Sequence, residues 1–239
     1  GGLLGHAGHV HDASYVEAAV ADEHPYAWLF LAHARGRVPL SLIRLRGGER
    51  EDVNARGRTL GRVGELLEVL EAIRTRRSIR RYGPEEVPWE QVETLIDAAR
   101  WAPSAGNLQP WEFVVVREQR TKELLARAAL NQRFIAQAPV VVVVCADPLR
   151  SASVYGPRGS GLYCVQDTAA ATQNMLLAAH SLGLGTCWVG AFYENEVRQV
   201  LGIPPDIRPV AIVPIGRPAE SLRPPRRRSL EEIIHLERF

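Results

Sequence analysis

The sequence predicts an α+β fold, in which helices pack on a sheet without a strict strand–helix–strand repeat. Three observations support this class. Stretches with an apolar stripe at helical spacing alternate irregularly with short apolar strands. One predicted strand, at 140–147, is a continuous apolar run, so we expect it to be buried on both faces. An alanine-rich stretch at 165–185 predicts one long helix, which Gly183 and Gly185 end.

The other elements follow in order along the chain. Apolar residues at 63, 66, 67, 70 and 73 predict a first helix, and Pro88 suits the first turn of a second. The capping-box pattern Ser229-x-x-Glu232 predicts a short helix near the end of a proline-rich arm. Between these lie expected strands at 112–118, 186–192 and 208–216, expected helices at 120–130, 134–137 and 194–202, and an expected loop at 154–163.

Composition limits the class of protein. The chain has 239 residues, 46% hydrophobic and 23% charged, which suits a folded domain with a sizeable core. Its apolar runs are far shorter than the roughly 20 residues that span a bilayer, and its first residues lack the layout of a signal peptide. We therefore expect a cytoplasmic protein without a membrane span. A net charge of +2 argues against a non-specific nucleic-acid binder.

The chain is expected to have two parts. Residues 1–61 read as an irregular appendage of unknown role, with one short helix near 14–34 and a hairpin-like segment. Residues 62–239 carry the regular patterns and form the main domain. The three cysteines are odd in number and lack C-x-x-C spacing, which indicates buried thiols rather than a metal site.

Arginine carries almost all of the positive charge. Lys122 is the only lysine, and no glycine-rich stretch ends in Gly-Lys, so a Walker-type phosphate loop is excluded. The run "RTRRSIRR" at 74–81 is open to two interpretations, a solvated helix end or a phosphate cradle in which Ser78 adds a hydroxyl. A second cluster at 226–228 favours the cradle, because two distant arginine groups could converge on one phosphate.

The turn "WAPSAGNLQPW" at 101–111 joins a predicted helix to a predicted strand. Its prolines fix backbone angles, Gly106 permits an unusual one, and its hydroxyl and carboxamide groups offer donors and acceptors. From these residues alone, a capped corner and a ligand-facing loop are equally plausible.

Four motifs, in this order along the chain, together resemble those of a known protein family. They are "RRSIRRY", "WAPSAGNLQPWEFVVV", "DTAAATQNMLLAAHSLGLGTCWVGAF" and "VPIGRPAESLRPPRRRSLEEIIH". Over residues 65–239 the chain resembles the FMN-dependent nitroreductases. The resemblance implies a homodimer with FMN at the subunit interface, a mostly antiparallel sheet flanked by helices, and arms exchanged between subunits.

The resemblance also implies roles for single residues. One group matches the run that binds the phosphate and ribityl chain, a second the loop that the other subunit lays against the isoalloxazine ring, and a third the contacts to the ring edge and N5. A final basic pair matches phosphate ligands. The phosphate and ribityl group is Arg76, Arg77, Ser78 and Arg80, and the loop group is Pro103, Ser104, Ala105 and Asn107. The group at the ring edge and N5 is Asn131, Trp188, Val189 and Gly190, and the basic pair is Arg226 and Arg228.

The implied chemistry is hydride transfer from NAD(P)H, through flavin N5, to a nitroaromatic, a quinone or an activated alkene by a ping-pong mechanism. We expect no side chain to act as acid or base and no metal site. Val189 stands where some nitroreductases have a glutamate, which leaves the choice between NADH and NADPH open. Two alternatives remain: specialised flavin chemistry such as reductive dehalogenation or flavin fragmentation, and a flavin-binding sensor without turnover.

Overall fold

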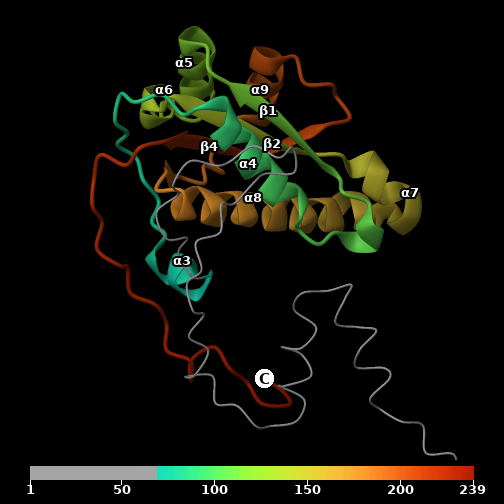
Figure 1. Ribbon diagram of the computed structural model, residues 1–239. Coiled ribbons are helices and arrows are strands. Elements are labelled where there is room, and N and C mark those ends of the chain that lie inside the picture. Colours follow the sequence, from blue (N-terminus) through green and yellow to red (C-terminus); the bar gives the residue numbers. More distant parts are fainter. Residues whose placement is uncertain (1–68) are drawn as a thin grey trace, which may run out of the picture. The chain divides into compact units, whose positions relative to one another are not determined.

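The computed structural model describes residues 69–239, and the expected appendage at 1–61 lies outside the described residues. Within 69–239 an antiparallel four-stranded sheet has the order β1-β2-β4-β3, and Figure 1 labels β1, β2 and β4. Its strands are β1 (Trp111–Val116), β2 (Val140–Ala146), β3 (Gly185–Thr186) and β4 (Arg208–Gly216). The α+β class is confirmed.

Most predicted helices are also present. They are α3 (Val69–Thr75), α4 (Trp89–Arg100), α5 (Gln119–Ala128), α6 (Phe134–Gln137), α8 (Cys164–Ser181) and α9 (Glu194–Leu201). The chain also forms elements that were not predicted: helix α7 (Pro148–Arg158), a 3₁₀ turn η2 (Ala105–Asn107) and a π-helical segment η3 (Gly159–Tyr163). None of the helices described is long and apolar enough to cross a membrane.

Three local predictions were wrong. The segment 154–163 is helical, because Asp147 caps α7 by accepting from the Arg150 N–H (2.9 Å), and η3 carries the helix on into α8. The strand predicted at 186–192 pairs regularly only at β3, with a single further bridge at Val189. At Ser229 the backbone N–H bonds Glu232 (2.9 Å), but the chain makes only a turn there, because the arm is exposed and, within the described part of the chain, has no packed face that would stabilise a helix.

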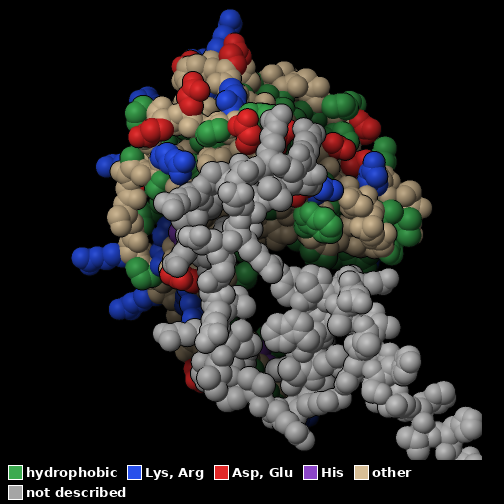
Figure 2. Space-filling model, in the orientation of Figure 1, with side chains coloured by type: hydrophobic (Ala, Val, Ile, Leu, Met, Phe, Trp, Pro, Cys, Tyr) green, Lys and Arg blue, Asp and Glu red, His purple; other side chains and the backbone are tan. Residues whose placement is uncertain are grey.

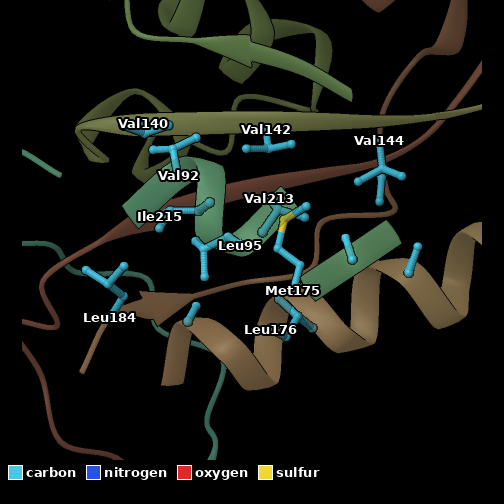
Figure 3. Packing of buried hydrophobic residues seen from close by; sticks show 14 of the residues in the cluster. Val92, Leu95, Val140, Val142, Val144, Met175, Leu176, Leu184, Val213 and Ile215 are labelled. Atoms are coloured by element: carbon cyan, nitrogen blue, oxygen red, sulfur yellow. The ribbon is translucent and has the colours of Figure 1, made fainter. Parts of the chain in front are cut away.

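Strand β2 lies at the centre of the packing. Val140, Val142 and Val144 face the layer formed by α4 and α8, where they meet residues such as Leu95 and Met175 (Figure 3). The alternate residues Val141, Val143 and Cys145 face the layer of α5, α6 and α9. This division follows from the two-residue period of a strand, and it confirms that β2 is buried on both faces.

Helix α8 determines where the site lies. It begins beside α7 and ends beside α3, and it crosses the face of the sheet under α4 (Figure 1). Its last turn is closed by Gly183, whose φ of 70° is the left-handed conformation that favours glycine, with the Gly183 N–H on the His180 carbonyl (3.0 Å). Two groups of predicted site residues lie at the two ends of this helix.

Candidate functional site

The arginine run lies along the edge of the sheet just after α3. Ser78 forms a parallel bridge with Thr186 of β3, and the Ile79 N–H donates to the Thr186 carbonyl (2.8 Å). The hydroxyl of Tyr82 donates to the Ile79 carbonyl (2.6 Å), which holds the run in an extended conformation. These bonds fix the backbone of the run, and Arg77 Nη1 also donates to the carbonyls of Arg74 (2.7 Å) and Arg76 (2.8 Å).

The C-terminal arm returns to the same edge. Glu220 accepts hydrogen bonds from the backbone N–H of Arg80 (2.6 Å) and of Arg81 (3.2 Å). Beyond it, the arm and the run enclose a pocket of about 350 Å³. The lining residues are Arg76, Arg77, Ser78 and Arg80 from the run, and Leu222, Arg223, Pro225 and Arg227 from the arm. Figure 2 shows basic side chains along this edge of the molecule.

Among the described residues, no acidic side chain lines this pocket. Burial lowers the pKa of Arg76, and the neighbouring charges of Arg77 and Arg227 lower it further. Within residues 69–239, none of these arginines has a carboxylate within 4 Å, and the buried Nε of Arg77 has no hydrogen-bond partner. A small anion with several acceptor oxygens is the complement of such a pocket.

The arm contributes arginines other than the two that the sequence motif indicated. Arg227 and Arg223 line the pocket, whereas Arg226 and Arg228 do not. The guanidinium of Arg228 faces Glu232, with Nε 3.8 Å from the carboxylate. The sequence could not choose among three adjacent arginines, because an extended arm turns alternate side chains to opposite sides.

The segment 188–190 passes close to the arginine run. Val189 is buried and exchanges both backbone bonds with Ile212 of β4 (2.9 Å each). Gly190 is exposed, its N–H has no partner among the described residues, and a Cβ built there would meet nothing within 4 Å. The adjacent Trp188 is 38% exposed. An open backbone donor beside an aromatic side chain can bind the edge of a planar ligand.

Asn131 lies at the same end of the molecule. Leu130 and Asn131 both have left-handed backbone conformations, with φ of 57° and 60°, and Asn131 is exposed. The next residue, Gln132, donates to the carbonyl of Ala191 (3.1 Å), which joins this turn to the segment after Gly190. The guanidinium of Arg80 lies 5.8 Å from the ring of Phe134.

The turn at 103–107 is rigid and is held by α8. The Ala105 N–H donates to the buried carboxylate of Asp167 (3.2 Å), and the Gln109 N–H donates to the Ser104 hydroxyl (3.0 Å). Desolvation raises the pKa of Asp167, while the Ala105 N–H opposes that rise. Pro103 and Asn107 stay exposed, so the turn presents groups to a ligand or to another chain.

The predicted site residues fall into two groups, because the turn lies at the opposite end of α8 from the arginines. Asp167 holds the turn, whereas His180 contacts Thr75, the residue before Arg76, through Nε2 and Oγ1 (2.8 Å). Thirteen residues separate Asp167 from His180, which is about 20 Å at 1.5 Å per residue. The chain therefore brings Arg76, Arg77, Ser78, Arg80, Asn131 and 188–190 to one end, and Pro103, Ser104, Ala105 and Asn107 to the other.

Sequence reasoning missed four residues of the site. Arg223, Glu220 and Asp167 carried no recognisable signal, because their roles depend on contacts across the fold. His180 looked like an ordinary packed or capping histidine, yet it lies beside the arginine run. Only its position in the last turn of a long helix next to a basic cluster could have indicated this.

The fold and the pocket define an α+β protein with a cluster of arginines around a pocket at a sheet edge. The model of the Nitroreductase family matches residues 73–132 and 119–217. A protein of Methanothermobacter thermautotrophicus, provisionally named an NADH dehydrogenase/NAD(P)H nitroreductase, is 40% identical over 185 residues, covering 75% of this chain and 91% of that one. The chain belongs to the nitroreductase family of oxidoreductases, which confirms the predicted resemblance.

Other relatives agree with this assignment. The FMN reductase [NAD(P)H] of Bacillus subtilis is 31% identical over 187 residues, covering 73% of this chain and 75% of the relative. Among solved structures, the Vibrio harveyi NADPH:FMN oxidoreductase, complexed with NAD⁺, has a TM-score of 0.66 at 28% identity. That comparison covers 72% of this chain and 77% of the Vibrio protein.

Proposed function

We propose that the protein is a homodimeric, FMN-dependent oxidoreductase that takes a hydride from NAD(P)H and passes it to a nitroaromatic, a quinone or an activated alkene in a ping-pong cycle. The observation that carries this proposal is the basic pocket, in which two segments far apart in the sequence supply five arginines and a serine. The names of relatives support it, including FMN reductase [NAD(P)H] and oxygen-insensitive NADPH nitroreductase.

The residues present suit FMN. Its phosphate would be held by Arg76, Arg77, Ser78 and Arg227, whose uncompensated charge and unpartnered Arg77 Nε call for an anion. The ring would lie toward Gly190 and Asn131, where an open N–H and a carboxamide can bond its heteroatoms. When bound, FMN supplies the two-electron chemistry by accepting and donating hydride.

The protein's own contribution is orientation and charge stabilisation. The Gly190 N–H would donate to the ring where negative charge gathers on reduction, and the carboxamide of Asn131 would bond the ring edge. Trp188 would shield one side of the ring from water. No side chain is needed as a general acid or base, since water can supply the protons.

A second subunit completes this site in the proposal. The turn at 103–107 and the arginine run contact points on α8 that are about 20 Å apart along the helix, so the turn would reach the ring bound by the other chain. Exposed apolar residues support such a dimer, with Val69 of α3 at 68%, Trp101 at 73% and Leu236 of the arm at 82% exposure. We propose that the two C-terminal arms are exchanged across this interface.

The test begins with the purified protein. We expect it to be yellow and dimeric, and we expect NADH or NADPH to bleach its flavin absorbance under anaerobic stopped flow. Re-oxidation by a quinone or a nitroaromatic should restore the colour. A protein that stays colourless after incubation with FMN would exclude the proposal, and bound FMN that neither coenzyme bleaches would reduce it to a flavin-binding module.

A further inference from the structure

We propose that a hollow beside Asn131, between α5 and the 131–137 segment, binds the adenosine diphosphate part of the nicotinamide coenzyme. This inference builds on the proposed function, and it assigns a place on this chain to the part of the coenzyme that does not react. The hollow has a volume of about 660 Å³, within the range of small-molecule sites. It is distinct from the phosphate pocket, which is lined by the arginine run and the arm.

Two arginines make this hollow an anion site. Arg127 and Arg133 both line it, and within the described chain neither has a carboxylate within 4 Å. Glu123 stands four residues before Arg127, the spacing at which a helical ion pair normally forms. It instead accepts from the Gln119 amide (3.2 Å). Both guanidinium groups are thus left to bind phosphate oxygens in bidentate fashion.

The remaining lining groups suit a nucleoside. Glu123 is a carboxylate acceptor of the kind that binds ribose hydroxyls. The amides of Gln119 and Gln137 offer donors and acceptors to the edge of a base. Ala126 and Ala136 line the hollow with methyl groups only, so nothing larger obstructs a flat ring. Together these groups provide for a diphosphate, a sugar and a base.

The position of the hollow connects it to the redox site. Asn131 lines it, and Gln132 joins the same turn to the carbonyl of Ala191, next to Gly190. A nicotinamide stacked on a ring held near Gly190 and Asn131 would therefore leave the rest of the coenzyme at the mouth of this hollow. A nicotinamide coenzyme thus fits better than a free nucleotide unrelated to the reaction.

The charges in the hollow also predict a coenzyme preference. A 2′-phosphate on the adenosine ribose would lie against Glu123, where like charges repel. NADH should therefore have a lower KM than NADPH. E123Q should reduce the NADPH-to-NADH ratio of KM by about tenfold or less. An E123Q variant that leaves the NADPH-to-NADH ratio of KM unchanged would overturn this assignment of the ribose position.

The main test uses the FMN-loaded protein and ADP-ribose, which has the diphosphate and both sugars but no nicotinamide. By isothermal titration calorimetry, the wild type should bind ADP-ribose, and R127E/R133E should bind it about tenfold more weakly or not at all. The same variant should raise the KM for NADH by a similar factor, while its FMN content and its KM for a quinone stay unchanged. R127Q/R133Q provides a milder variant should the charge reversal impair folding.

The control is R120E, which makes on α5 the same single charge reversal as R127E alone, at an exposed residue outside the hollow. It should leave ADP-ribose binding and the KM for NADH close to those of the wild type. Equal losses in R120E and R127E/R133E would overturn the pocket in favour of general electrostatic attraction. Unchanged binding in R127E/R133E would overturn it outright. A protein without FMN would instead contradict the proposed function, and ADP-ribose titration would still report on the hollow.

Discussion

The two ends of α8 differ in how far their charged and polar groups find partners within the described chain. At the end near α3, arginines crowd together, their charges oppose one another, and a buried guanidinium nitrogen lacks a partner among the described residues. At the end near α7, the turn at 103–107 is closed by its own bonds to Asp167 and Ser104. One end keeps positive charges close together and an unpartnered donor, whereas the other is closed by its own hydrogen bonds.

This difference indicates what each end does. A site that must gain and hold a charged ligand keeps unpaired charge, and ligand binding then stabilises the fold by mass action. A surface that must meet a ligand bound by another chain is better held rigid beforehand, because less order is lost on binding. The comparison therefore predicts that variants at the first end change ligand affinity and variants at the second mainly change stability.

The largest effect is expected for R76A/R227A. Each charge-assisted bond to a phosphate contributes about 1.5–3 kcal/mol, so losing two should weaken FMN binding by about 100-fold or more. FMN fluorescence titration of the apoprotein measures this directly.

The control for that experiment is R76A/R228A, since Arg228 faces Glu232 instead of the pocket. It should resemble R76A alone. If R76A/R228A lost as much affinity as R76A/R227A, the arm would have to be placed differently when FMN is bound, and the sequence motif would have indicated the phosphate ligand better than the structure does.

The contrast between Arg227 and Arg228 shows what sequence could establish. Periodicity was sufficient for the sheet and most helices, because β2 is apolar throughout and α4, α5 and α9 carry clear stripes. It failed at 154–163, because Gly156 and Pro157 are residues typical of loops. In the structure, Gly156 is only a single non-helical residue within α7. The motifs indicated which segments form the site. They could not indicate that α8 keeps two of those segments at opposite ends.

The second prediction concerns the rigid end, through Asp167. Removing its carboxylate in D167A leaves the Ala105 N–H without an acceptor and should lower the free energy of unfolding by about 1–3 kcal/mol. Asparagine keeps an acceptor, so D167N should retain most of this stability. Chemical denaturation of both variants measures the difference, and FMN affinity should fall much less than in R76A/R227A.

Asp167 also predicts a pH dependence. Its pKa is raised in the folded protein, so the folded state binds the proton more tightly than the unfolded chain does, and stability falls as pH rises above the usual range of Asp, near 4. D167N has no such group. The stability of the wild type relative to D167N should therefore decline between acidic and neutral pH and then level off; a rise would contradict the assigned direction.

A smaller effect is expected for G106A. Gly106 has a φ of 56°, and a Cβ built there would lie 2.8 Å from the Tyr155 hydroxyl. The left-handed backbone should cost about 1 kcal/mol, with a further contribution from the contact. Thermal unfolding should show the loss. G161A, where a Cβ would meet nothing within 4 Å, should be nearly neutral, and Y155F/G106A should recover the part due to the hydroxyl.

The smallest effect is expected at His180, which lies at the end of α8 near α3. Thr75 Oγ1 donates to the Glu71 carbonyl (2.7 Å), so it accepts from Nε2 of His180. Burial lowers the pKa of His180, Arg76 and Arg77 lower it further, and Glu71 partly opposes them. Because the unfolded chain binds this proton more readily, the apoprotein should lose stability as pH falls below about 6.5. H180Q should lose less over the same interval.

Binding of a phosphate should raise the pKa of His180, which is the opposite of the effect of the arginines. An anion bound beside Arg76 and Arg77 offsets the charges that disfavour the imidazolium, so binding raises the pKa of His180 and becomes tighter as pH falls. FMN affinity should therefore decrease between pH 6 and 8 more steeply in the wild type than in H180Q. The phosphate of FMN titrates near pH 6 in both proteins, so only the difference between their slopes reports on His180. Equal slopes would mean that His180 does not respond to charge in the pocket, and that only the arginines at this end respond to the bound anion.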